Sequence, residues 1–350
     1  MKKACLVVSN YLTGNKIFDT NRHRDNCVDR FVKLKKAMRQ EGYDLSTHDI
    51  NSIEQSQIVI YASNMPETLP KEEDIEKSYL ILSESEFIRP DNYDVKKHAF
   101  FNKIFTWADD LVDNNKYIKL NYAHAFPTHI NKDLSTKKKL CVLISGNKKP
   151  IPTLNKKLLA LDLYGERVKA IRWFEANQPN DFDLYGVGWD RYRFSGPKII
   201  RALNRIPRLA QFTLKLTGSA YSSYKGTIKH KKPIMQQYKF SISYENARDI
   251  PGYITEKIFD SFFAGCVPIY WGANNISNHI PTNTFIDKRN FESYEELHRY
   301  IKSITDSDYL RILENIEDYL YSDLAYPYKS EGFAQTIIRT ILNNYGRNKR

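Results

Sequence analysis

The chain has 350 residues, a formal net charge of +12, and contents of 41% hydrophobic and 27% charged residues. This length predicts two domains of roughly 100–200 residues each, and the composition is that of a globular protein rather than a disordered one. The excess of cations favours an anionic partner, such as nucleic acid, an anionic lipid surface or a phosphorylated small molecule. Because no zinc-finger, homeodomain or RNA-binding signature occurs, we expect no nucleic acid partner.

The cysteines and the N-terminal segment indicate the cellular compartment in which we expect the protein. Cys5, Cys27, Cys141 and Cys266 lack the spacing of metal ligands. Three of them lie in apolar runs or at helix ends, which predicts buried free thiols in a reducing compartment. The apolar part of the opening segment MKKACLVVSNYL is too short for a signal peptide or a membrane span. We therefore expect a cytoplasmic protein.

The first half of the chain alternates apolar runs with an amphipathic stretch, which predicts a doubly wound α/β domain over residues 1–130. Strands are expected at 4–9, 58–61, 79–82 and 104–107, and a helix at 25–42. No dinucleotide-binding glycine motif opens this domain. A stretch rich in turn residues and lysines, 125–139, is the expected linker.

The strand-and-helix pattern starts again at Leu140, which predicts a second α/β domain over residues 140–330. Its expected strands are 140–145, 182–185, 240–244 and 267–271, with the sheet pattern continuing at 274–279 and 285–286, and its expected helices are 163–177, 255–264, 291–304 and 309–321. A last amphipathic helix at 332–345, within a separate segment 331–350, is expected to cross back to the first domain.

Polar side chains follow the expected strand 240–244, at the edge where open α/β sheets bind ligands. Glu245 and Asn246 end the strand, and the loop-to-helix junction holds Tyr253, Thr255 as the N-cap, Glu256 and Lys257. A helix N-terminus with a nearby lysine suits phosphate, and a carboxylate there suits sugar hydroxyls. In the alternative interpretation, Glu256 only complements the helix dipole and Lys257 is a solvated surface charge.

The stretch from Tyr238 to Gly272 resembles the C-terminal signature of glycosyltransferase family 10, the α-1,3/4-fucosyltransferases. The matching segments are Tyr244-Glu245-Asn246, Tyr253-Ile254-Thr255-Glu256-Lys257 and Val267-Pro268-Ile269-Tyr270-Trp271-Gly272. The resemblance implies a GT-B-like fold, in which two Rossmann-like domains face a cleft. It also implies that GDP-fucose is the donor, contacted by Tyr253, Glu256 and Lys257, and that no cofactor or metal is required.

Two carboxylates, Glu84 and Glu86, follow the expected strand 79–82, where a general base would meet an acceptor hydroxyl. Family 10 has a Glu-Ser-Pro element here. Glu84-Ser85 matches it, whereas Glu86 replaces the proline, so the resemblance implies Glu84 as the base ahead of Glu86. A solvated acidic loop is the alternative interpretation.

The expected helix 163–177 contains Arg167-Val168-Lys169, which is similar to a family element whose arginine meets the donor diphosphate. An arginine fork binds such oxygens through two parallel hydrogen bonds. A surface arginine on a charged helix is the alternative interpretation.

Five further segments carry weaker signals. The Asp-x-Asp triplets at 181–183 and 306–308 do not lie between a strand end and a loop, so no metal site is predicted there. Gly186-Val187-Gly188 lets a ligand approach the backbone. Lys225-Gly226 either borders the donor phosphates or belongs to a solvated basic hairpin. For the basic segment 198–218 we favour an insertion packed on the domain or an excursion of unknown role; the alternative is an amphipathic segment on an anionic membrane.

The sequence thus predicts an inverting fucosyltransferase that moves fucose from GDP-fucose to a hydroxyl of a glycan acceptor. The expected linkage is α-1,3 on an N-acetylglucosamine- or glucose-type unit of a surface polysaccharide or lipopolysaccharide. Expected catalytic residues are Glu84, Arg167, Glu256 and Lys257, and expected donor-binding residues are Arg167, Glu245, Asn246, Tyr253, Glu256 and Lys257. The alternatives are a transferase of another GDP-sugar and a catalytically inactive nucleotide- or glycan-binding protein.

Overall fold

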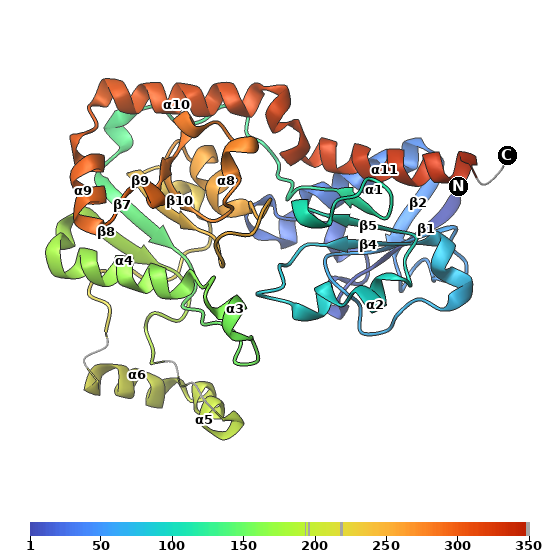
Figure 1. Cartoon of the computed structure of the whole chain (residues 1–350), viewed down its shortest axis with the longest axis horizontal. Coiled ribbons are helices and arrows are strands. Elements are labelled where there is room, and N and C mark those ends of the chain that lie inside the picture. Colours follow the sequence, from blue (N-terminus) through green and yellow to red (C-terminus); the bar gives the residue numbers. More distant parts are fainter. Residues whose placement is uncertain (193, 195–196, 218–219, 348–350) are drawn as a thin grey trace.

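The computed structural model describes residues 1–192, 194, 197–217 and 220–347, and it contains two α/β domains (Figure 1). The first holds a six-stranded sheet of order β2-β1-β3-β4-β5-β6, and the second a five-stranded sheet of order β11-β10-β9-β7-β8. Every strand pairing recorded within these two sheets is parallel. Parallel sheets need crossover connections that cover their faces, so the strands are buried on both sides. The expected fold class is confirmed.

The first sheet is built around β3, whose residues Ile58–Tyr61 are all buried. Its other strands are β1 (Lys2–Val7), β2 (Tyr43–Thr47), β4 (Ser78–Leu82), β5 (Lys103–Thr106) and β6 (Tyr117–Lys119), and its helices are α1 (Asp29–Gln40) and α2 (Val95–His98). The helix expected at 25–42 begins only at Asp29, because Asp25 has a φ of 56° and leaves the helical region.

The second sheet consists of β7 (Lys139–Ile144), β8 (Phe182–Tyr185), β9 (Tyr238–Tyr244), β10 (Val267–Trp271) and β11 (Ile286–Asp287). Its helices are α3 (Lys156–Leu159), α4 (Tyr164–Asn177), α5 (Lys198–Ala202), α6 (Pro207–Leu216), α7 (Lys232–Met235), α8 (Glu256–Phe263), α9 (Tyr294–Ser303) and α10 (Asp306–Tyr321). The expected continuation of the sheet at 274–279 is wrong, since Ile276–Asn278 form a 3₁₀ turn.

The last helix, α11 (Ser330–Arg347), leaves the second domain and lies along α1 of the first (Figure 1). Phe333 packs edge-on against Phe31, with ring centroids 5.7 Å apart. Phe333, Ala334, Ile337 and Ile341 all belong to the buried core of the first domain. The first domain therefore takes part of its core from the far end of the chain.

The two domains also meet at a close backbone contact. Gly252, with a φ of 78°, lies so near the first domain that a Cβ atom would be 2.4 Å from the carbonyl oxygen of Trp107. Beside it, Asp109 accepts a hydrogen bond of 2.7 Å from Asn275 Nδ2 and lies 3.0 Å from His279 Nε2. This contact fixes the loop that follows β9 against the first domain.

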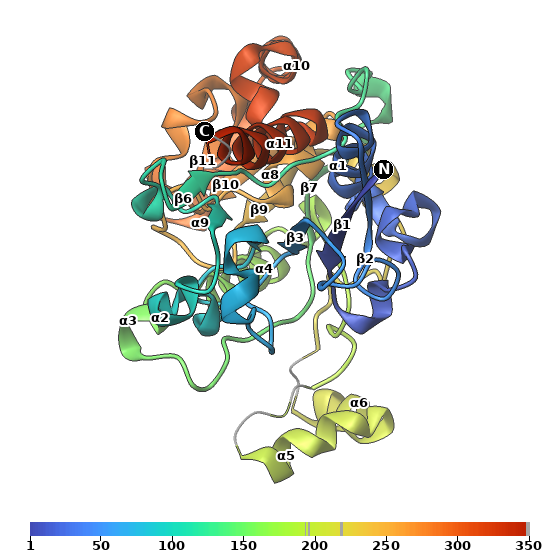
Figure 2. The same ribbon diagram turned by 90° about the vertical axis from the view of Figure 1, so that its right-hand side faces the viewer.

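Helices α5 and α6 form a hairpin that projects from the second domain, away from both sheets (Figures 1 and 2). The hairpin has its own small interior, in which Ala210 and Leu214 are buried. Asn204 Nδ2 donates to the carbonyl of Phe194, and Tyr192 N–H donates to the carbonyl of Ala210. The segment 198–218 is therefore an excursion as far as it is described; Gly218 itself lies outside the described residues.

Three of the four cysteines, Cys5, Cys141 and Cys266, are buried free thiols, whereas Cys27 is exposed. Within the described ranges of the chain, none of the helices has the length and apolarity needed to cross a bilayer.

Candidate active site

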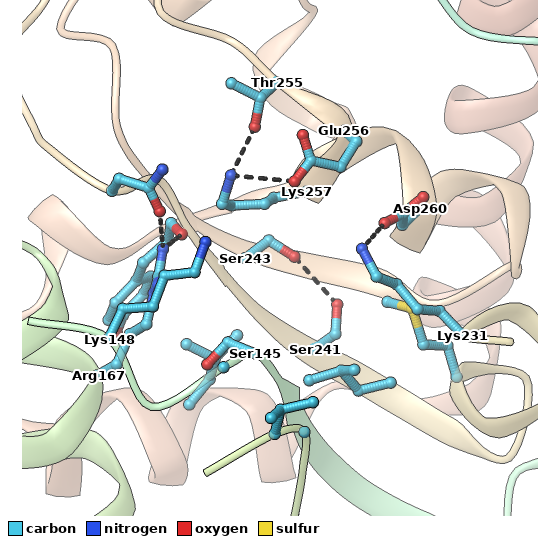
Figure 3. Close-up of a pocket in the computed structure, with 18 of the residues that line it drawn as sticks. Ser145, Lys148, Arg167, Lys231, Ser241, Ser243, Thr255, Glu256, Lys257 and Asp260 are labelled. Carbon is cyan, nitrogen blue, oxygen red and sulfur yellow. Dashed lines mark hydrogen bonds and ion pairs between the residues drawn. The ribbon is translucent and has the colours of Figure 1, made fainter. Parts of the chain in front are cut away.

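A cavity of about 340 Å³ lies between the domains, beyond the carboxyl ends of β7 and β9. Arg24, Glu84 and Tyr122 line it from the first domain. The second domain contributes most of the wall, including Ser145, Lys148, Arg167, Lys231, Ser241, Ser243, Asn246, Tyr253, Thr255, Glu256, Lys257 and Asp260 (Figure 3). The cavity thus occupies the edge of the sheet at which α/β proteins bind ligands.

Glu245 lies beneath the cavity rather than in its wall. Its side chain is fully buried and accepts hydrogen bonds from the backbone N–H and the hydroxyl of Thr255, at 2.8 and 2.7 Å. The expected contact of Glu245 with the donor therefore stays a prediction, since its carboxylate is bonded to Thr255 and Lys257 and does not line the cavity. Thr255 does occupy the N-cap position of α8, but it makes no side-chain cap because its hydroxyl is bonded to Glu245.

Lys257 joins the buried layer to the cavity. Its Nζ lies 3.0 Å from Glu245 Oε2, 2.7 Å from Thr255 Oγ1 and 3.3 Å from Glu256 Oε1 (Figure 3). Burial opposes the charge, but the two carboxylates outweigh it and raise the pKa of Lys257 above its usual value. Lys257 is therefore a fixed cation, which contradicts the interpretation of a solvated surface charge.

Glu256 is the first residue of α8, and its carboxylate also lines the cavity. Burial alone would raise the pKa of Glu256, yet the charges of Lys257 and Lys231 hold it well below the usual range. Glu256 is consequently ionised at neutral pH and can accept hydrogen bonds from hydroxyl groups of a ligand.

Arg167, on α4, is 4% exposed and holds the end of β9. Its Nη2 donates to the carbonyls of Tyr244 and Glu245, at 2.6 and 2.8 Å, and lies 3.2 Å from Asn246 Oδ1. Asn246 Nδ2 in turn donates to the hydroxyl of Tyr253 at 3.2 Å. Arg167 is thus a buried cation in the cavity wall, and its Nη2 is fully used in shaping that wall.

Tyr253 is buried between the domains. Its ring packs on Trp107 of the first domain, with centroids 4.8 Å apart. Trp107 itself donates from Nε1 to the carbonyl of Ser83, next to Glu84. This stack connects the loop that carries Glu84 to the loop that carries the α8 N-terminus.

Glu84 enters the cavity from the loop after β4. Its backbone is held on both sides, because its N–H donates to Asn64 Oδ1 at 3.3 Å and its carbonyl accepts from Asn92 Nδ2 at 3.0 Å. Burial, and then the negative charge of Glu256, raise the pKa of Glu84. Glu86 does not line the cavity. The structure therefore presents Glu84 as the acidic side chain of this loop that faces the second domain.

Three cations in the wall were not predicted: Arg24, Lys148 and Lys231. Lys148, in the loop after β7, is exposed and has no hydrogen bond or ion pair within the described ranges of the chain. Lys231 forms a 2.6 Å ion pair with Asp260 of α8, and burial together with Glu256 raises the pKa of Asp260 to about 6. Lys225, for which a place beside the donor phosphates was one of two interpretations, lies 3.5 Å from Asp183 and does not line the cavity.

The glycine loop after β8 behaves as expected at one position. Gly186 and Val187 line the cavity. Gly186 has a φ of 133°, and a Cβ atom there would lie 1.9 Å from the carbonyl oxygen of Ser145. Only glycine permits this approach of the β7 and β8 loops.

The two Asp-x-Asp triplets are engaged in ion pairs away from the cavity. Asp181 lies 2.8 Å from both His298 and Lys302, and Asp183 lies 2.5 Å from Lys139. Asp306 pairs with Lys239 at 2.6 Å. In the part of the chain that the structure describes, no cluster of three or more His, Cys, Asp or Glu side chains is placed to hold a metal.

The two doubly wound domains and the cavity between them define a GT-B glycosyltransferase architecture. Two solved structures of α1,3-fucosyltransferase share it: one with GDP has a TM-score of 0.54 at 17% identity and covers 98% of this chain and 91% of its own. One with GDP-fucose has a TM-score of 0.52 at 16% identity, covering 97% and 90%. Anabaena HepE with UDP and glucose has a TM-score of 0.54 at 9% identity, covering 98% and 100%.

Part of the chain is similar in sequence to one glycosyltransferase family. Residues 200–323 match the model "Glycosyltransferase family 10 (fucosyltransferase) C-term". The α-(1,3)-fucosyltransferase FucT of Helicobacter pylori is 30% identical over 131 residues, 36% of this chain and 27% of that protein. An α-(1,4)-fucosyltransferase of Arabidopsis thaliana is 39% identical over 77 residues, 22% of this chain and 19% of that protein. The matches span about a quarter of these relatives' length. Residues 200–323 are thus similar to the C-terminal part of glycosyltransferase family 10, which confirms the resemblance over that part of the chain.

Proposed function

We propose that this protein is an inverting fucosyltransferase that uses GDP-fucose as donor and a hydroxyl of a glycan as acceptor. One observation carries the proposal: a single cavity places Glu84 of the first domain opposite Lys257, Arg167 and the N-terminus of α8 in the second. A carboxylate facing a cluster of cations is what transfer from a nucleoside-diphosphate sugar needs, a base on one side and charge stabilisation on the other.

The second domain would hold the donor. The N–H groups at the start of α8 and the cations Lys257, Arg167 and Lys148 suit the diphosphate. The ionised carboxylate of Glu256 and the hydroxyl of Tyr253 suit hydroxyl groups of the sugars. Because Arg167 Nη2 already has three oxygen partners, its remaining N–H groups and its charge are what it offers to the donor.

In the reaction, the acceptor oxygen attacks the anomeric carbon from the face opposite the GDP leaving group, and the carbon–oxygen bond to the diphosphate breaks. Glu84 takes the proton from the attacking hydroxyl, for which its raised pKa suits it. The electron pair leaves with GDP, whose growing negative charge is offset by Lys257 and Arg167. The configuration at the anomeric carbon is inverted.

The proposal divides the work between the domains. Residues 1–130 would bind the acceptor, and residues 140–330 the donor. We further propose α-1,3 transfer to an N-acetylglucosamine- or glucose-type unit of a surface polysaccharide or lipopolysaccharide, on the cytoplasmic side of a membrane. The similarity to the α-(1,3)-fucosyltransferase FucT of Helicobacter pylori supports this linkage.

The test of the proposed function is a screen of GDP-sugars against glycan acceptors, with the product read by mass. We expect a fucosylated product and release of GDP, both unchanged in EDTA, because Lys148, Arg167 and Lys257 already bring positive charge to the cavity. Product formation that vanishes in EDTA and returns with a divalent cation would contradict the metal-free scheme. GDP binding without any transfer would indicate a catalytically inactive binding protein instead.

Lys148→Ala tests the donor site with little risk to the fold, since Lys148 is exposed. Loss of a charge-assisted hydrogen bond should weaken GDP affinity by about tenfold to a hundredfold, measured by calorimetry or by the GDP-dependent rise in melting temperature. Lys149→Ala is the matched control, because Lys149 is the next residue, is exposed and does not line the cavity. Equal GDP affinity in both variants would remove Lys148 from the donor site.

A further inference from the structure

The α5–α6 hairpin exposes apolar side chains that no other part of the described chain covers. Ile199 is 84% exposed, Phe212 64% and Leu216 75%. Phe212 and Leu216 are four residues apart on α6, so they lie on the same side of the helix, opposite the buried Ala210 and Leu214. Large apolar side chains presented together in this way mark an interaction surface.

The charge around this surface has one sign. From Arg191 to Tyr244 the sequence contains no aspartate or glutamate. Lys198, Arg201, Arg205 and Arg208 of the hairpin are exposed, and none forms an ion pair with a described residue. A partner that covers the hairpin must therefore supply both negative charge and an apolar interior.

From these observations we infer that the α5–α6 hairpin binds the surface of an anionic lipid bilayer, with Phe212 and Leu216 entering the boundary between headgroups and acyl chains. A helix with bulky apolar residues on one side and arginines beside them is the pattern of interfacial membrane helices. Nucleic acid would satisfy the arginines and leave Phe212 and Leu216 in water, and a second copy of this basic hairpin would repel the first. An anionic bilayer satisfies both sets of side chains.

The segments on either side of the hairpin connect its contact with the membrane to the cavity. The hairpin lies between Trp189 and Tyr221, whose rings meet on the core of the second domain. Gly186 and Val187 shortly before it, and Ile228 and Lys231 shortly after it, line the cavity. A docked hairpin would hold the cavity close to the membrane plane. Acceptors anchored in lipid would then reach the site more easily than free ones. The lipid contact itself does not depend on the proposed transferase activity.

The experiment is co-sedimentation of the full chain with vesicles of phosphatidylcholine alone or mixed with phosphatidylglycerol. We expect binding only to the mixed vesicles, weakened by salt because the contact is electrostatic in part. The charge reversals Arg201→Glu and Arg208→Glu should together lower the affinity by at least about thirtyfold, given the contribution of each basic residue near an anionic surface. Phe212→Ser with Leu216→Ser should also abolish sedimentation with vesicles.

Lys36→Glu with Arg39→Glu is the matched control, because these exposed residues of α1 change the net charge equally but lie in the other domain. The control should retain vesicle binding, and all variants should keep the wild-type GDP affinity and melting temperature. Three results would overturn the proposal: equal loss in the control, vesicle binding that is unaffected by the serine variants, or hairpin-dependent binding to RNA or to a second copy of the chain without binding to vesicles.

Discussion

Glu84→Gln is expected to lower the transfer rate by about a hundredfold to ten-thousandfold, the usual contribution of a general base. Glutamine keeps the shape of the side chain, and the backbone of residue 84 is held by Asn64 and Asn92, so the loop should stay in place. GDP affinity should change little, because the cations that would bind the diphosphate belong to the other domain. Initial rates at saturating donor, together with calorimetry for GDP, measure both quantities.

Glu86→Gln is the control for this variant. Glu86 lies in the same loop, two residues away, and does not line the cavity, so its variant should remain active. An inactive Glu86→Gln beside an active Glu84→Gln would transfer the role of base to Glu86. Full activity of both variants would place the base elsewhere.

The raised pKa of Glu84 gives a second, independent readout. Because the folded state raises this pKa, it binds the proton of Glu84 more tightly than the unfolded state does. The stability from this group is therefore present at low pH and is lost as the pH rises through the raised value. At neutral pH, Glu84→Gln should melt at a higher temperature than the wild type while being less active. An unchanged melting temperature would mean that the ionised carboxylate of Glu84 does not destabilise the folded protein.

Lys257→Met should be the most destabilising single substitution in the site, at about 3–5 kcal/mol. It leaves the fully buried carboxylate of Glu245 without its cation, 3.0 Å away in the wild type. Denaturant unfolding of the ligand-free protein measures the loss. Lys169→Met is the control: Lys169 pairs with Glu166 on the surface at 2.7 Å, and such exposed pairs contribute only about 0–1 kcal/mol.

The double variant Glu245→Gln with Lys257→Met separates the structural role of the lysine from its role toward the donor. Removing both charges should restore most of the lost stability, because the fully buried carboxylate of Glu245 is removed together with its cation. GDP affinity should nevertheless stay about tenfold to a hundredfold below the wild type, since the cation is gone. Recovery of GDP affinity in the double variant would show that Lys257 serves only to neutralise Glu245.

The strands that could be predicted from the sequence are those that consist mostly of apolar residues. Ile58–Tyr61 and Phe182–Tyr185 were predicted with their observed bounds, because every or nearly every side chain in them is buried. The strand Tyr43–Thr47 was missed. It contains Ser46 and Thr47, whose hydroxyl groups are accommodated in the sheet by a partner far along the chain, Asn15. Such long-range hydrogen bonds leave no periodic signal in the sequence.

The residues that line the cavity were predicted where they belong to one continuous segment, and they were missed where they come from separate segments. Asn246, Tyr253, Glu256 and Lys257 all line the cavity and come from a single strand–loop–helix unit. The partner of the Glu245 carboxylate could not be predicted from the sequence, because a carboxylate suits a ligand as well as a buried lysine. Only the packing of the folded chain decides between the two. Lys231 lay within a run of lysines, and only its pairing with Asp260 distinguishes it.

The position of α11 implies an order in which the two domains complete their folding. Phe333, Ala334, Ile337 and Ile341 complete the core of a domain whose other strands and helices all lie before residue 130. During synthesis, the first domain therefore waits with an open apolar face on α1 until nearly the whole chain has emerged, while the second domain already has its five strands. Domains usually complete in the order in which they are made. Here the domain that is made first is the last to close, and the exposed face of α1 is the surface that a chaperone would have to shield in the meantime.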